Sequence, residues 1–262
     1  MLKRRLTSLV LILLLVAPAA VQAAEIVDKS RLDKGVISVE YKSARSIPSK
    51  VLISKDGERY IYDLDANNSF PLQGGDGEYT IAVVENVTGN TFKVVHQEEI
   101  SLALPDKNTV YLQSIQLIHW SEEMEPVKRA RELTAKAKTD QEKLEAIYED
   151  VVKRIRYDDL KARTVGSGYI PSIEETYASG LGICYDYAAL TAAMLRSTGV
   201  PTRLVMGYKE DLQGYHAWNE VYLQEREEWA VIDTTYDAMQ VQNKVPAVIV
   251  KDGSEYQAQK RY

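Results

Sequence analysis

Three side chains in the second half of the chain are of the types that nucleophilic acyl chemistry uses: Cys184, His216 and Asp233. Cys184 is the only cysteine, so it cannot form a disulfide within the chain. It is an inert buried residue, an intermolecular linker or a reactive thiol. A cysteine nucleophile needs a base for its proton, and the base needs a group that orients it. We therefore predict that Cys184 is the nucleophile, His216 the base and Asp233 the orienting carboxylate.

The sequence around Cys184 predicts that this residue opens a helix. Residues 188–195 are mostly strong helix formers, and Gly199 followed by Pro201 ends the run. The unpaired N–H groups and the positive dipole end of a first helical turn favour a thiolate, and these N–H groups can also hold a developing oxyanion. The backbone N–H of Cys184 is the one oxyanion donor that we predict. We interpret Asp186 as a carboxylate that interacts with the helix dipole.

His216 and Asp233 are predicted to lie on two paired strands. Residues 215–223 alternate along one strand that contains His216, and residues 229–233 form a second strand that ends in Asp233. A turn centred on the bond between residues 224 and 225 would place His216 directly opposite Asp233, with both side chains on the same face. A slip of one residue would separate them. Taken singly, His216 would be a packed strand histidine and Asp233 a turn residue, but their combination with Cys184 favours a triad.

Three further residues are weaker candidates for the site. Trp218 shares its strand face with His216 and would either wall the acyl site or pack in the core. Tyr157 and Asp158 follow a predicted helix and would border the cleft. His96 and His119 are isolated in the sequence, so we interpret both as structural.

The segments that contain these residues resemble the transglutaminase-like superfamily, most closely its exported bacterial members. The resemblance covers roughly residues 120–240 and implies a papain-like α+β core, with Cys184, His216 and Asp233 in the roles given above. The predicted mechanism needs no metal or organic cofactor. Thr234 departs from the pattern, because many relatives have proline after the aspartate. The motifs, specific only as an ordered set, are Gly182-Ile-Cys184-Tyr-Asp, Met194-Leu-Arg196-Ser-Thr-Gly-Val-Pro201, Gly207-Tyr208, His216-Ala-Trp218-Asn-Glu and Trp229-Ala-Val-Ile-Asp233.

The elements that must position the site predict a chain of the α+β class with two domains. Residues 24–120 contain several short strands between turn signals such as Asp56-Gly57, which predicts a small β-sandwich-like domain. Residues 121–262 are assigned to the transglutaminase-like catalytic domain. Its first helices are predicted at residues 125–138 and 141–156, the second capped by Thr139, and residues 161–171 are expected to form a loop.

The first 23 residues are predicted to be a secretory signal peptide. Three basic residues precede an apolar run at residues 6–16, and small residues follow as far as Ala23. The run is short for a bilayer span, although an uncleaved anchor is the alternative. Removing this segment would change the net charge of the chain from −6 to −9, which gives no electrostatic reason to bind nucleic acid. We therefore expect a secreted or cell-envelope protein that has no stable membrane span after cleavage.

The predicted function is acyl transfer from an amide through a thioester on Cys184. With an amine acceptor the result is cross-linking, and with water it is deamidation or hydrolysis. A cysteine peptidase or amidase acting on cell-wall or protein peptides would use the same triad, and a non-catalytic binding or scaffold protein is the alternative from another class. The expected partner is a protein or peptide substrate, and association of the amino-terminal β region with the cell wall is left open.

Overall fold

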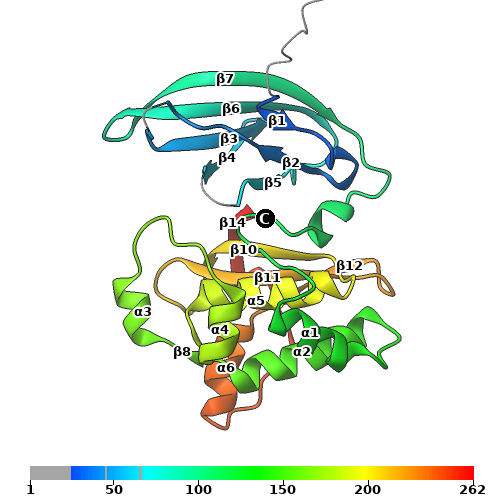
Figure 1. Cartoon of the computed structure of the whole chain (residues 1–262). Coiled ribbons are helices and arrows are strands. Elements are labelled where there is room, and N and C mark those ends of the chain that lie inside the picture. The colour runs from blue at the N-terminus through cyan, green and yellow to red at the C-terminus, as the bar shows by residue number, and fades with distance from the viewer. Residues whose placement is uncertain (1–24, 45, 65–66) are drawn as a thin grey trace, which may run out of the picture.

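The computed structural model describes residues 25–44, 46–64 and 67–262, so the segment interpreted as a signal peptide lies outside the described residues. The chain consists of a β region followed by a mixed region of helices and strands (Figure 1), and the predicted α+β class is confirmed. Within the described part, no helix has the length and apolar character needed to cross a membrane.

The amino-terminal β region consists of two sheets around a shared apolar core. The sheets have the strand orders β1-β2-β5 and β4-β3-β6-β7, and Ile37, Phe70 and Ile81 are among the buried side chains between them. The predicted hairpin at Asp56-Gly57 is confirmed, since both residues have positive φ, at 50° and 86°. The strands are β1 (Val27–Asp28), β2 (Val36–Val39), β3 (Ser49–Lys55), β4 (Glu58–Asp63), β5 (Ser69–Pro71), β6 (Gly77–Thr88) and β7 (Thr91–Leu102).

The second region is built on a five-stranded antiparallel sheet that lies between the β region and the helices (Figure 1). Its strand order is β13-β12-β11-β10-β14, so the last two strands of the chain form its two edges. A short parallel pair, β8 and β9, lies beside the helices. The strands are β8 (Arg156–Tyr157), β9 (Leu181–Gly182), β10 (Thr202–Lys209), β11 (His216–Leu223), β12 (Glu228–Ile232), β13 (Val250–Lys251) and β14 (Tyr256–Arg261).

Helix α5 is the central helix of this region, since nearly all of its side chains are buried among the other helices and β11. The predicted cap of α2 is confirmed, because the Thr139 side chain accepts a hydrogen bond from the backbone N–H of Glu142 at 3.1 Å. The loop predicted at residues 161–171 begins instead with part of α3, which Asp158 caps. The helices are α1 (Glu125–Thr134), α2 (Asp140–Arg154), α3 (Asp159–Thr164), α4 (Ile173–Ser179), α5 (Cys184–Ser197) and α6 (Thr234–Gln242).

The pairing of β11 with β12 differs from the predicted register by two residues. Asn219 pairs with Ile232, so the turn is centred one residue later than predicted, and His216 lies beyond the last paired residue of β12. Asp233 directly follows β12 and caps α6. Because the error is an even number of residues, the predicted face of every side chain on the two strands is preserved.

Side chains from the second region pack against the amino-terminal β region. Trp229 and Tyr262 contact the amino-terminal core, and their rings lie 5.3 Å from Tyr111 and 5.5 Å from Tyr60. The buried guanidinium of Arg196 donates hydrogen bonds to the carbonyl oxygens of Gln113, Thr202 and Tyr262. The two regions therefore share contacts, and a domain boundary at residue 120 stays a prediction.

Candidate active site

Cys184 is the first residue of α5, as predicted. Its own N–H has no acceptor within the helix, because the first N–H groups of any helix lack an intrahelical partner. Asp186 accepts a hydrogen bond from the backbone N–H of Ile183 at 2.8 Å and so fixes the residue before the cysteine. The thiol is partly exposed while most of the helix behind it is buried. This placement suits a nucleophile with an oxyanion donor on its own backbone.

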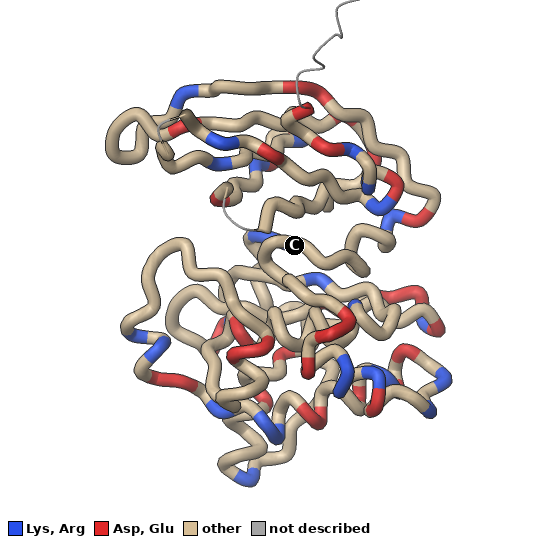
Figure 2. Tube along the Cα trace, in the orientation of Figure 1, with Lys and Arg blue, Asp and Glu red and all other residues tan. Residues whose placement is uncertain are grey.

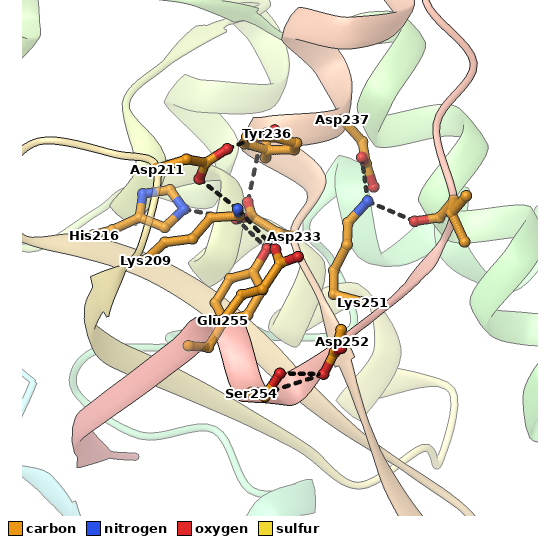
Figure 3. A network of polar contacts seen from close by, with 12 residues as sticks. Lys209, Asp211, His216, Asp233, Tyr236, Asp237, Lys251, Asp252, Ser254 and Glu255 are labelled. Carbon is orange, nitrogen blue, oxygen red and sulfur yellow. Dashed lines mark hydrogen bonds and ion pairs between the residues drawn. The ribbon is translucent and has the colours of Figure 1, made fainter.

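His216 and Asp233 lie in direct contact. The Nε2 atom of His216 is 2.7 Å from Oδ2 of Asp233, and the carboxylate is fully buried (Figure 3). Because Nε2 faces the carboxylate, Nδ1 is the nitrogen left to interact with the sulfur of Cys184. The imidazole is thus bracketed by a carboxylate on one side and a thiol on the other, which is the arrangement that base-assisted thiol chemistry needs.

Asp233 is held by two further donors besides the histidine. Its Oδ1 atom accepts a hydrogen bond from the backbone N–H of Tyr236 at 3.0 Å, so the carboxylate is also the cap of α6. Its Oδ2 atom accepts from the hydroxyl of Tyr256 on β14 at 3.2 Å. Sequence reasoning missed Tyr256, because it lies far along the chain in a segment with only weak alternation.

The environment of His216 favours its protonated form. Burial of the ring opposes a positive charge, but hydrogen bonds to Asp233 and Cys184 and the charges of these groups outweigh burial. Together they raise the pKa of His216 to about 9. At neutral pH the imidazole therefore carries the proton.

A cavity of about 250 Å³ opens directly onto Cys184 and His216. Its aromatic walls come from Tyr169, Tyr185 and Tyr215, and the sequence reasoning did not identify these residues. A larger hollow of about 840 Å³ lies on α1 and α2, but neither a cysteine nor a histidine lines it. The smaller cavity is therefore the candidate acyl site.

A buried polar cluster holds the loop that forms one wall of this cavity. Asp186 is fully buried and accepts a hydrogen bond from the hydroxyl of Tyr169, and it forms an ion pair with Lys161 at 2.8 Å. The Lys161 ammonium also lies 4.6 Å from the centre of the Tyr169 ring. The role predicted for Asp186 was too simple, because its carboxylate binds the loop to the start of α5 in addition to lying near the helix dipole.

The weaker candidates fall outside the cavity. Trp218 is buried and packs with Val205 and Tyr256, and its ring stacks on that of His216 at 6.2 Å, so it supports the histidine from behind. Tyr157 lies near enough to Cys184 that burial and the charge of the sulfur both raise its pKa. Asp158 caps α3.

The remaining histidines lie elsewhere. His96 pairs with Glu98 at 3.1 Å on β7, and His119 is exposed beside Ser114. Among the residues that the structure describes, no group of three or more His, Cys, Asp or Glu side chains could hold a metal ion.

Thr234, the departure from the expected proline, is the first residue of α6. Its hydroxyl lies 3.1 Å from that of Thr191, and both side chains are buried. Thr191 is two turns along α5 from Cys184, so this hydrogen bond joins the helix of the aspartate to the helix of the cysteine. A proline would favour the first helical position by its fixed φ. Thr234 instead provides a side-chain contact between the two helices.

One family profile and several solved structures are similar to parts of this chain. Residues 127–234 match the sequence profile of the transglutaminase-like superfamily, whereas no curated protein sequence matches the chain. The chain is similar to a provisionally assigned cysteine protease from Cytophaga hutchinsonii, with 15% identity over 82% of this chain and 84% of that chain and a TM-score of 0.43. It is also similar to the periplasmic domain of TgpA from Pseudomonas aeruginosa, with 17% identity over 78% and 88% and a TM-score of 0.42.

Proposed function

Residues 127–234 of this chain belong to the transglutaminase-like superfamily, and from that premise we propose that the protein is an exported cysteine enzyme that transfers acyl groups from amide bonds through a thioester on Cys184. One observation carries the proposal: His216 contacts Asp233 at 2.7 Å and lines the same cavity as the chain's only cysteine. Nucleophile, base and orienting carboxylate come from α5, β11 and the start of α6.

The first half of the reaction forms the thioester. The Cys184 thiolate attacks the amide carbonyl carbon, and the oxygen gains a negative charge that the Cys184 backbone N–H stabilises. The His216 imidazolium then gives its proton to the amide nitrogen, the carbon–nitrogen bond breaks and an amine or ammonia leaves. Asp233 keeps the imidazole oriented and stabilises its positive charge throughout.

The second half of the reaction resolves the thioester. Water or an amine attacks the thioester carbon and loses a proton to His216, while the Cys184 sulfur leaves as thiolate. This step regenerates the thiolate and the protonated imidazole. An amine acceptor gives a new amide, and water gives a carboxylic acid, so transferase and hydrolase activities differ only in the acceptor.

The lining of the cavity supports an uncharged acyl donor. None of the residues around this cavity is Asp, Glu, Lys or Arg, and an unpaired charge would lose much of its solvation among Tyr169, Tyr185 and Tyr215. We propose that the donor group is a neutral amide, such as the side chain of glutamine or a backbone amide beside an apolar residue. The partner is then a protein or peptide substrate.

The proposed location outside the cytoplasm is supported by the basic, apolar and small-residue pattern of residues 1–23. In the view of Figure 2, basic and acidic residues are interspersed along the backbone of both regions, and the net charge of −6 gives no electrostatic reason to bind nucleic acid. Amino-terminal sequencing of the protein recovered outside the cytoplasm would test the location, with residue 24 or a near neighbour as the expected first residue.

The reaction is tested by trapping the thioester. The full chain without its predicted signal peptide is mixed with a library of glutamine-containing peptides, quenched in acid and analysed by intact-mass spectrometry. We expect a covalent acyl group on Cys184, no such group in Cys184→Ala, and a loss of most labelling in His216→Gln. An unlabelled wild-type protein, or equal turnover by Cys184→Ala, would refute the thioester mechanism.

The products separate the alternative functions. A primary amine added to the mixture gives an amine adduct if the enzyme is a transferase, whereas a cut backbone identifies a peptidase and a carboxylic acid in place of the side-chain amide identifies a deamidase. If the protein is instead a non-catalytic binding protein, Cys184 should react with iodoacetamide no faster at neutral pH than an ordinary thiol does.

A further inference from the structure

The carboxy-terminal segment lies outside the part of the chain that matches the superfamily profile but completes the sheet that contains the site. The matching part, residues 127–234, supplies β10, β11 and β12. The chain then forms α6, adds β13 to the edge at β12, and continues to the opposite edge, where β14 pairs with β10. At the start of β14 the chain passes close to the Asp233 side chain, which the Tyr256 hydroxyl contacts.

The backbone around Tyr256 is fixed to β10 by several contacts. Tyr256 pairs with Lys209, and the backbone N–H of Glu210 donates to the carbonyl of Glu255 at 3.0 Å. The buried ammonium of Lys209 also forms an ion pair with the Glu255 carboxylate at 3.0 Å, and Figure 3 shows both residues next to Asp233. Gly207 provides the space for this approach, because a Cβ atom there would lie 2.0 Å from the carbonyl oxygen of Gln257.

The Tyr256 ring is equally constrained. It packs 5.1 Å from the ring of Trp218, which in turn stacks on His216, so one aromatic layer supports both the phenol and the imidazole. The Tyr256 hydroxyl donates to Oδ2 of Asp233, the same oxygen that contacts His216. With the Tyr236 N–H on Oδ1, the carboxylate is held from two directions besides the histidine.

We infer that Tyr256 is a positioning residue of the active site, which holds the Asp233 carboxylate in the plane where it meets Nε2 of His216. The inference rests on the proposed function, since Asp233 matters for catalysis only if His216 acts on Cys184. Without the hydroxyl, Oδ2 keeps only the imidazole contact. The cap hydrogen bond from the Tyr236 N–H fixes Oδ1 alone, so Oδ2 can turn away from Nε2 of His216. The carboxy-terminal segment, which follows the profile-matching residues 127–234 in the sequence, thereby contributes a residue to their active site.

The other charged groups near Asp233 do not replace this hydroxyl. From α6, the Asp237 carboxylate is occupied by Lys251 and Tyr148. From β10, Lys209 is paired with Asp211 and Glu255. Among the described residues, the hydrogen-bonding partners of the Asp233 carboxylate are therefore His216, Tyr236 and Tyr256.

The test replaces Tyr256 by phenylalanine and follows His216 directly. The chain has three histidines, so the His216 ring signals can be assigned by comparison with His216→Gln and titrated by nuclear magnetic resonance. We expect Tyr256→Phe to lower the proton affinity of His216 roughly tenfold, because the carboxylate no longer faces the ring continuously. Alkylation of Cys184 by iodoacetamide at neutral pH should slow with it. Neither readout needs a substrate, so failure of the proposed reaction would be seen separately in the thioester experiment.

The matched control is Tyr148→Phe, which removes a buried hydroxyl that donates to Asp237 at 2.9 Å, on the same helix as Asp233. This change should destabilise the fold to a similar degree while leaving the His216 titration and the alkylation rate as in wild type. An unchanged or raised proton affinity of His216 in Tyr256→Phe, or an equal decrease in Tyr148→Phe, would overturn the inference.

Discussion

Two buried carboxylates lie one turn apart at the start of α6, where Asp233 caps the helix and Asp237 lies in its first turn, and only one of them belongs to the candidate active site. Asp233 and Asp237 are both fully buried, and each accepts a hydrogen bond from a tyrosine hydroxyl. Each also has one basic partner, which is His216 for Asp233 and Lys251 for Asp237. In burial and hydrogen bonding the two sites are nearly alike.

The difference lies in what the basic partner contacts next. His216 lines a cavity together with Cys184, whereas the Lys251 ammonium donates to the carbonyl oxygen of Val248 in the segment before β13. Burial raises the pKa of Asp237 in spite of Lys251 and Tyr148, so a perturbed carboxyl group marks the structural site here. A buried carboxylate with a basic neighbour therefore indicates catalysis only when that neighbour also reaches a nucleophile.

The largest expected effect comes from Asp233→Asn. An asparagine can still cap α6 through its carbonyl oxygen, but its amide group would then face Nε2 of His216 as a donor. The imidazole would be forced into the tautomer with its proton toward Cys184, and we expect turnover of the peptide found by thioester trapping to fall about a thousandfold or more. The fold should persist, as measured by circular dichroism and thermal unfolding.

The matched change Asp237→Asn should give the opposite pattern. It leaves the Lys251 ammonium without its buried partner, which should lower the free energy of unfolding by about 3 kcal/mol, while turnover stays near wild type. Similar losses of turnover in the two variants would show that both carboxylates serve the reaction, and the distinction drawn between them would be wrong.

The second prediction concerns pH. The pKa of His216 is raised from 6.5 to about 9, so the folded state holds this proton more tightly than the unfolded chain does. The resulting stability is fully present below about pH 6.5 and is lost as the pH rises through about 9. Between pH 7 and pH 10 the free energy of unfolding should fall by about 2 kcal/mol more in wild type than in His216→Gln, measured by urea denaturation.

Activity should decrease over the same alkaline range, because the neutral imidazole has no proton to give to the leaving amine. The Asp237→Asn variant should keep this alkaline limit, since Asp237 does not contact His216. If the alkaline limit of activity shifted in Asp237→Asn but not in Tyr256→Phe, the assignment of the catalytic role to Asp233 and of the structural role to Asp237 would be wrong.

Local sequence signals predicted the parts of the site that depend on neighbouring residues. Cys184 was predicted correctly as the first residue of α5. The prediction used the helix formers that follow the cysteine and the helix-ending residues Gly199 and Pro201. Strand alternation placed His216 on the correct face, with Trp218 beside it. These signals are short in range, and no distant part of the chain alters them.

The parts that could not be predicted depend on turn geometry and distant contacts. The β11–β12 turn contains Glu227 in the left-handed conformation, at a φ of 52°, which the residue type gives no reason to expect. The register prediction therefore failed by two residues. Tyr256 reaches Asp233 only because β14 crosses to the far edge of the sheet, and Tyr169 reaches Asp186 only through the loop after α3.

The smallest expected effect tests the contact between the helices of Cys184 and Asp233. Removing either hydroxyl, by Thr234→Val or Thr191→Val, leaves the other buried without its partner and should cost about 1 kcal/mol of unfolding free energy. The double variant should cost clearly less than the sum of the two, because the second change removes the group that the first left unsatisfied. Strict additivity would mean that the hydroxyls do not interact. Thr234→Pro should retain activity, since proline suits the first helical position and the Asp233 cap does not use the Thr234 side chain.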